Sequence, residues 1–228
     1  MESIPKQVME SMTCARYTHA RAVITPRWLE QYQTPKARAP QKGPPPNGPL
    51  RVDPLSIPLE LRRHHAWANW AYEYADNRWS KPPYDPFTGE VADPADIATW
   101  SDFEDCWRAY QDRLVPKQGQ RPYDGVSFAL NYRFGLVGID LDHISEHRLD
   151  ADRIVRTVDS YTEHSPSGDG YRIFVRGTLP EGRRRRDWVE MTARRFFSVT
   201  GHKLTESPPM IQSNQRGLYD VWARYVRG

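Results

Sequence analysis

The stretch FGLVGIDLDH, residues 134–143, places two aspartates inside an otherwise apolar run. Successive side chains of a β-strand point to opposite faces, so Asp140 and Asp142 share one face while Ile139 and Leu141 share the other. Two half-buried carboxylates repel each other and lose hydration, so one must be protonated or a cation must lie between them. Oxygen ligands without Cys or His favour Mg²⁺ or Mn²⁺. The alternative is that both carboxylates point into solvent.

A Ser/Gly-rich turn enters a strand in EHSPSGDGYRIFVRG, residues 163–177. Ser167, Gly168 and Gly170 allow a close approach to the backbone, and Arg172 adds a positive charge at the exit of the turn. Backbone amides of such a turn can form an anion-binding nest, and an arginine beside it can hold a phosphate. The alternative is an ordinary hairpin turn.

A third acid follows in VEMTARRFFSVTGH, residues 189–202, where Glu190 is a lone acid in an apolar strand and two arginines come after it. A third carboxylate with nearby cations would complete a site for a metal ion and a triphosphate. The four-arginine run 183–186 is interpreted as either a solvated loop or a contact with a nucleic-acid backbone. Lys81, in the turn SKPPYDPFTG, is either a phosphate contact or a solvated turn lysine.

Length and composition favour one well-cored domain with appendages, since the chain has 228 residues of which 38% are hydrophobic. The sequence contains no apolar run of membrane-spanning length and no signal-peptide pattern, so we expect a soluble, cytoplasmic protein without a membrane partner. Its two cysteines are isolated, which argues against a disulfide framework or a zinc ribbon. Charge is uneven: residues 172–203 hold nine Lys/Arg and three Asp/Glu, which suits a site for metal and phosphate.

Three regions are predicted along the chain. Eight of the twenty prolines fall in the first 50 residues, so residues 1–55 are interpreted as a mobile, disordered arm rich in Pro and basic residues. Residues 56–207 are expected to form the catalytic domain. Residues 208–228 carry a helical apolar stripe, and they form either a C-terminal helix or the start of a missing linker or helicase region.

The patterning predicts an α+β fold with a mostly antiparallel sheet, acids on one face and helices on the other. Ser101 and Glu104 form a capping box before an amphipathic helix, and residues 149–161 predict a second helix. Strands are predicted at 125–130 and 134–141, joined as a hairpin, and then at 171–177, 188–191 and 195–201.

Taken together, five stretches resemble the primase-polymerase domain of the archaeo-eukaryotic primase superfamily, in particular the phage- and plasmid-encoded bifunctional DNA primase/polymerases. The resemblance runs over residues 65–204, and its elements in order are RWSKPPYDPFTG, TWSDFEDC, GIDLDH, SPSGDGYRIFVRG and VEMTARRFFSVTGH. It implies an RRM-like catalytic core with flanking helices.

The resemblance also implies roles for individual residues. Asp140 and Asp142 match the first catalytic motif, which binds divalent metals, and Glu190 matches the third, acidic motif. The second motif is typically Ser-Gly-x-Gly-x-His; here Arg172 stands in the histidine place, where it can bind phosphate but cannot act as an acid or base near neutral pH. The implied nucleotide-binding residues are Ser167, Gly168, Gly170, Arg172, Arg195, Phe196 and His202.

The implied function is template-directed nucleotidyl transfer on single-stranded DNA, using NTP or dNTP and two Mg²⁺ or Mn²⁺ ions, in phage- or plasmid-type replication. A helicase would be supplied by a separate chain or by a missing C-terminal region. Two alternatives stay open: a catalytically impaired replication accessory that binds nucleotide or single-stranded DNA, and a metal-dependent nuclease.

Overall fold

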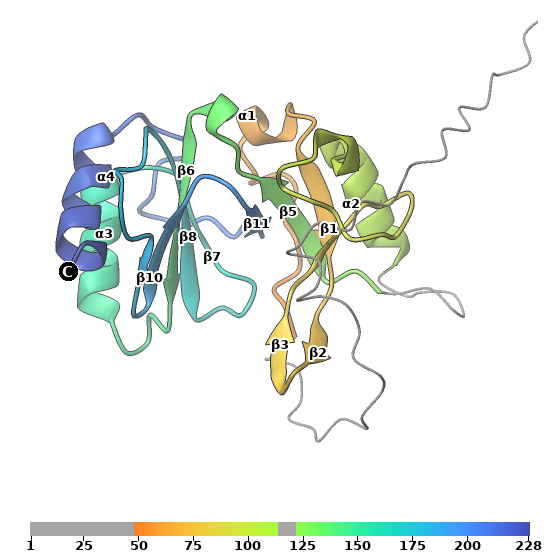
Figure 1. Cartoon of the computed structure of the whole chain (residues 1–228), viewed down its shortest axis with the longest axis horizontal. Helices are drawn as coiled ribbons and strands as arrows, with labels where there is room; N and C mark the ends of the chain where they lie inside the picture. Colours follow the sequence, from red (N-terminus) through yellow and green to blue (C-terminus); the bar gives the residue numbers. More distant parts are fainter. Residues whose placement is uncertain (1–47, 114–121) are drawn as a thin grey trace, which may run out of the picture. The chain divides into compact units, whose positions relative to one another are not determined.

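The computed structural model describes residues 48–113 and 122–228 (Figure 1). The predicted arm therefore lies outside the described residues up to position 47. The described strands form a four-stranded sheet in the order β11-β5-β1-β4, a five-stranded sheet in the order β7-β8-β6-β10-β9, and the separate hairpin β2-β3. All named strand pairs are antiparallel, which confirms the predicted α+β class with mostly antiparallel strands.

The four-stranded sheet consists of β1 (Trp67–Trp70), β4 (Pro83–Tyr84), β5 (Gly125–Ala129) and β11 (Phe196–Val199). The elements around it are α1 (Leu59–Arg62), the hairpin strands β2 (Glu73–Ala75) and β3 (Arg78–Ser80), the 3-10 helix η2 (Ile97–Thr99) and α2 (Phe103–Asp112). Helix α2 buries Phe103, Cys106 and Tyr110 in the same hydrophobic core as Trp67 and Phe128 of the sheet. The amphipathic helix predicted here is therefore confirmed.

The predicted capping box of Ser101 and Glu104 is wrong, because the N-cap of α2 is Asp102 and its side chain makes no capping hydrogen bond. Ser101 is used differently: its backbone N–H and C=O exchange hydrogen bonds with Trp67, at 2.8 and 2.9 Å. A residue bound on both sides to a neighbouring strand keeps an extended backbone, so the helix begins only after it.

The five-stranded sheet consists of β6 (Leu136–Asp142), β7 (Thr162–His164), β8 (Gly170–Arg176), β9 (Arg185–Arg186) and β10 (Val189–Thr192). One face is covered by α3 (Arg148–Val158) and α4 (Gln215–Val221), the latter continuing into the π-helical turn η4 (Trp222–Val226) (Figure 1). Ile139 and Leu141 of β6 lie on this face, in one buried cluster with Ile154 of α3 and Leu218 of α4. The alternation in FGLVGIDLDH thus places the aspartates on the face away from these helices.

The predicted hairpin between residues 125–130 and 134–141 is wrong, because β5 and β6 belong to different sheets. Between them lies the 3-10 helix η3 (Tyr132–Phe134), followed by Gly135 with φ +61°. This left-handed glycine redirects the chain out of the four-stranded sheet. β5 pairs instead with β1 and β11, and β6 pairs with β8 and β10.

The aspartate-bearing face of the five-stranded sheet looks toward the four-stranded sheet. Leu136 of β6 and Phe174 of β8 share a buried cluster with Phe128 of β5 and Phe197 of β11. The rings of Phe174 and Phe197 meet edge to face, with centroids 5.1 Å apart. Apolar side chains therefore pack against the four-stranded sheet at one end of this face, and the charged side chains at its other end form the candidate site.

No helix within residues 48–113 and 122–228 is long and apolar enough to cross a membrane.

We expect Gly201→Ala to destabilise the fold, because Gly201 has φ +75° and an added Cβ would lie 2.0 Å from the backbone oxygen of Asp53. The cost of a positive φ and of overpacking should together be about 2–4 kcal/mol in the free energy of unfolding. Gly135→Ala is the matched control, since Gly135 also has a positive φ but its Cβ would meet nothing within 4 Å. Denaturant unfolding of both variants measures the difference, and equal losses would contradict this account.

Candidate functional site

Five charged residues form one row across the five-stranded sheet, one residue from each strand. In the register of the strands, Glu163 of β7 lies opposite Arg172 of β8, and Arg172 lies opposite Asp140 of β6. Asp140 in turn lies opposite Glu190 of β10, and Glu190 lies opposite Arg185 of β9. Residues directly opposite in antiparallel strands project from the same face, with Cβ atoms about 4.5–5.5 Å apart. We call these five residues the charged row.

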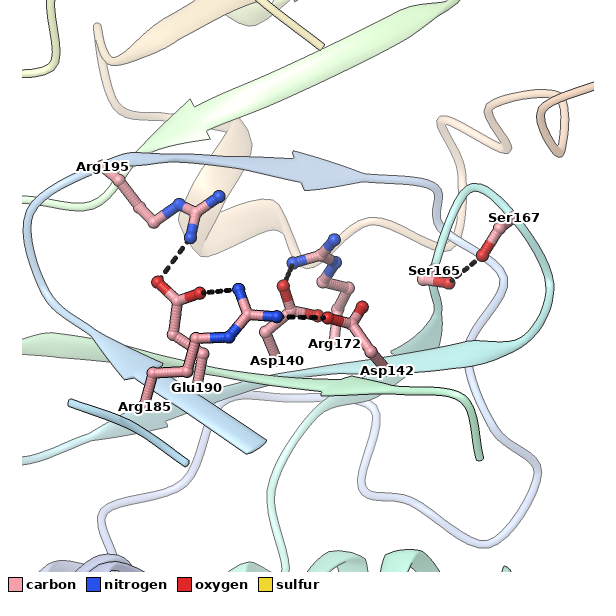
Figure 2. A network of polar contacts seen from close by, with 8 residues as sticks. All are labelled: Asp140, Asp142, Ser165, Ser167, Arg172, Arg185, Glu190 and Arg195. Atoms are coloured by element: carbon pink, nitrogen blue, oxygen red, sulfur yellow. Dashed lines mark hydrogen bonds and ion pairs between the residues drawn. The ribbon is translucent and has the colours of Figure 1, made fainter. Parts of the chain in front are cut away.

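At the centre of the charged row, Asp140 forms a buried ion pair with Arg172 (Figure 2). The two side chains are only 7% and 6% exposed. Arg172 is further held by Phe197, because its guanidinium lies 4.7 Å from the centroid of that ring. Asp140 Oδ1 is buried without a hydrogen-bond partner among the described residues. This carboxylate is therefore neutralised on one side and has an unused acceptor on the other.

The other two predicted acids are paired with arginines at the edge of the row. Arg195 Nη1 lies 2.5 Å from Glu190 Oε1, and Arg185 Nη1 lies 3.1 Å from Glu190 Oε2. Arg185 also reaches Asp142, with Nη2 and Oδ2 3.5 Å apart. Burial raises the pKa of Asp142, and the neighbouring charge of Asp140 raises it further. The structure thus brings together Asp140, Asp142, Glu190, Arg172 and Arg195, five of the predicted site residues.

The Ser/Gly-rich turn enters β8 next to these acids, because Gly170 lies opposite Asp142 in register. Within the turn, the Gly168 backbone N–H donates to the Ser165 carbonyl at 2.9 Å. The hydroxyl oxygens of Ser165 and Ser167 are 3.0 Å apart (Figure 2). The predicted phosphate-binding turn therefore lies at one end of the carboxylate-bearing face.

Two predicted nucleotide-binding residues contact other parts of the chain. His202 Nε2 lies 2.5 Å from the Arg51 carbonyl oxygen. Phe196 begins β11 and is half-buried, but the aromatic ring against Arg172 is that of its neighbour, Phe197. Among the described residues, neither Phe196 nor His202 has a hydrogen bond or ion pair with the three acids.

Glu163 belongs to the charged row although the sequence analysis did not select it. It is fully buried, and its carboxylate accepts hydrogen bonds from the backbone N–H groups of Thr200 and Gly201, at 2.8 and 2.9 Å, and from the Tyr161 hydroxyl at 2.8 Å. These bonds tie β7 to the residues that follow β11. Burial raises the pKa of Glu163 to about 7, while the donated hydrogen bonds and Arg172 act in the opposite direction. A lone acid in a strand, the signal used for Glu190, would have found it.

Lys81 is not a solvated turn lysine. Its Nζ lies 5.7 Å from the ring centroid of Trp70, at the end of β1. Burial lowers the pKa of Lys81 to about 8, Arg172 and Arg195 lower it, and the charges of Asp140 and Asp142 raise it. A cation from the side of the four-stranded sheet thus shares the electrostatic environment of the charged row.

The donor chemistry of this face fits a hard divalent cation. The three acids supply only oxygen ligands, which Mg²⁺ and Mn²⁺ prefer, and the unpartnered Asp140 Oδ1 is an acceptor that a cation would satisfy. With the arginines paired as they are, the described residues contain no group of three or more His, Cys, Asp or Glu side chains close enough to hold a metal. Cation binding therefore requires the acids to exchange arginine partners for the metal.

We expect Glu163 to make stability depend on pH. Its folded-state pKa of about 7 exceeds the ordinary value of 4.5, so the stability it contributes is fully present below pH 4.5 and is lost as pH rises through 7. The difference in unfolding free energy between wild type and Glu163→Gln should fall over this range by on the order of 3 kcal/mol, because one pKa unit corresponds to about 1.4 kcal/mol. Denaturant unfolding between pH 4 and 8 measures it, and a pH-independent difference would show that Glu163 titrates normally.

We expect Lys81 to lose its proton near pH 8, against an ordinary value of 10.5. NMR titration of ¹³C-methylated lysines measures this pKa, with Lys81→Arg identifying the signal. Asp142→Asn should lower the value further, because the carboxylate stabilises the ammonium form. A titration near the ordinary lysine value would contradict the buried position of Lys81.

Comparison with known proteins finds a similarity to a phage protein. No family model matches the chain. Over 126 residues the chain is 34% identical to a protein named DNA primase-polymerase from Nitratiruptor phage NrS-1, in a match that covers 53% of this chain. The chain spans only 16% of the length of that relative. This similarity supports a primase-polymerase domain in the chain, as its motifs predicted.

Proposed function

We propose that this chain catalyses template-directed nucleotidyl transfer on single-stranded DNA, as a DNA primase/polymerase of phage- or plasmid-type replication. The observation that carries the proposal is the gathering of Asp140, Asp142 and Glu190 on one sheet face together with arginines. The similarity to the phage DNA primase-polymerase supports it. We also propose that the domain has an RRM-like catalytic core. A helicase would act with it, supplied by a separate chain or by a further C-terminal region.

The acids would bind Mg²⁺ or Mn²⁺ between their oxygens. When bound, such ions activate the attacking hydroxyl and stabilise the departing pyrophosphate. Arg195 and Arg172 would offset the charge of the triphosphate, since guanidinium groups bind phosphate oxygens bidentately. Ser167 in the turn would add its hydroxyl and its backbone N–H as donors for the same phosphates, while the N–H of Gly168 is used within the turn.

An aromatic series offers a place for the template strand. From β1 onto the hairpin β2-β3, the rings of Trp70 and Tyr72 have centroids 5.2 Å apart, those of Tyr72 and Trp79 6.1 Å, and those of Trp79 and Tyr74 5.2 Å. Tyr74 and Trp79 are half-buried and keep part of their surface in solvent. Stacking of a base on such a ring contributes about 1–3 kcal/mol and tolerates any sequence.

The buried Asp140–Arg172 pair favours a second candidate, the accessory that binds nucleotide or single-stranded DNA without catalysis. An arginine in the usual histidine place neutralises the first metal-binding carboxylate, and both side chains are nearly inaccessible to solvent. If this pair does not open, the site keeps its affinity for phosphate but makes no product.

We expect Asp140→Asn combined with Asp142→Asn to reduce metal-dependent nucleotide incorporation on single-stranded DNA by at least about 1,000-fold, which corresponds to about 4 kcal/mol of lost transition-state stabilisation. Primer synthesis and extension with each nucleotide set measure this loss. Asp142→Asn alone is included because Asp142 is more exposed than Asp140, so its loss disturbs packing less. Asp152→Asn, on the exposed side of α3, is the control and should retain activity.

Undiminished synthesis by the double variant would rule out this centre. Nucleotide binding by the wild type without any product would favour the accessory. Degradation of labelled DNA with Mg²⁺ and no nucleotides would favour the nuclease.

A further inference from the structure

One arginine of the four-arginine run differs from its neighbours in what it contacts. Arg185 bridges two predicted metal ligands, with Nη1 at 3.1 Å from Glu190 and Nη2 at 3.5 Å from Asp142 (Figure 2). Arg184 donates instead to the Pro180 carbonyl, and Arg186 lies 3.7 Å from its neighbour Asp187. The run is therefore neither wholly solvated nor wholly available to nucleic acid.

The bridge solves an electrostatic problem that Asp142 and Glu190 would otherwise have. Both carboxylates project from the same face, and burial already disfavours the charged form of Asp142. A guanidinium has five N–H donors in a planar fork, so one side chain can serve two carboxylates. Arg185 thus does what a bound cation would do between these two acids.

Arg185 is also the most exposed of the three arginines paired with the acids. Its side chain is 59% exposed, that of Arg195 is 43% exposed, and that of Arg172 is 6% exposed and packed on Phe197. Ion pairs with that much solvent contact contribute little to stability, because water screens the attraction and the side chains lose conformational freedom. A divalent cation can therefore displace Arg185 at small cost, and Arg172 only at a larger one.

The charge balance indicates where the displaced arginine goes. Three acids, Asp140, Asp142 and Glu190, are paired with three arginines, Arg172, Arg185 and Arg195, so the paired set is neutral. Each divalent ion added to it leaves two excess positive charges on the same face. A triphosphate is the nucleotide group whose negative charge would balance such an excess, and free guanidinium groups bind it well.

We propose that Arg185 is a resident counterion that occupies the cation position between Asp142 and Glu190 and transfers to the triphosphate when a divalent ion takes its place. This inference rests on the proposed function and adds to it a coupling: metal and triphosphate each make the other bind more tightly. Such coupling is reciprocal by thermodynamic necessity.

The test measures binding to the full chain rather than activity. Mn²⁺ affinity without nucleotide is followed by electron paramagnetic resonance of the free ion, and affinity for a non-reactive α,β-methylene dNTP analogue is measured by calorimetry at fixed free Mn²⁺. Arg185→Ala should bind Mn²⁺ about 5-fold more tightly and the analogue about 5-fold more weakly than the wild type does. A factor of about 5 is the lower end of the usual range for coupling between two ligands. Arg184→Ala removes the same charge from the same run without removing the bridge, so both affinities should stay as in wild type.

Unchanged Mn²⁺ affinity in Arg185→Ala would overturn the inference, as would equal effects of Arg184→Ala or unchanged analogue binding. The Mn²⁺ measurement contains no nucleotide, so it tests the counterion even if the chain proves unable to polymerise. Conversely, a polymerising wild type with an unaltered Mn²⁺ affinity in Arg185→Ala would leave the proposed function intact and remove only Arg185 from it.

Discussion

The buried ion pair between Asp140 and Arg172 is the interaction on which the arrangement of this face depends. Breaking a buried pair by removing one partner typically costs about 3–5 kcal/mol, because the remaining charge is left uncompensated. Here the two partners are opposite each other in the register of β6 and β8. A slip of one residue in either strand would turn the charge of that strand onto the face covered by α3 and α4, where the packing is apolar. The pair and the strand register therefore support each other.

The rest of the site is built outward from this pair. Glu163 lies opposite Arg172 in register and accepts hydrogen bonds from the backbone after β11, so it fastens the five-stranded sheet to the residues that follow β11. Phe197 packs against both Arg172 and Phe174, which joins the charged end of the face to its apolar end. On the solvent side the acids rely on Arg185 and Arg195, which are more exposed. The site is thus more deeply buried at its centre than at its edge.

The sequence predicted features that depend on local periodicity. Alternation in FGLVGIDLDH placed Asp140 and Asp142 on one face, and the apolar spacing of residues 149–161 predicted the helix α3, which ends at Val158. The sequence did not predict which strands pair when the partners lie far apart in the chain. A three-residue connection between apolar strands favours a hairpin, but β5 finds its partners in β1 and β11, and β6 finds its partners in β8 and β10. Arg185 was interpreted only as part of the four-arginine run, because its place opposite Glu190 follows from the pairing of β9 with β10. Glu163 was missed although it is a lone acid in a strand, as Glu190 is.

We expect this face to bind divalent ions and a nucleotide triphosphate together. A crystal structure of the chain with Mn²⁺ and a non-reactive dNTP analogue would test this, since anomalous scattering locates the ions. Mn²⁺ should lie between the oxygens of Asp140, Asp142 and Glu190, with the triphosphate against the arginines that have left them. Mn²⁺ and analogue bound elsewhere, with the Asp140–Arg172 and Arg185 pairs unchanged, would contradict it.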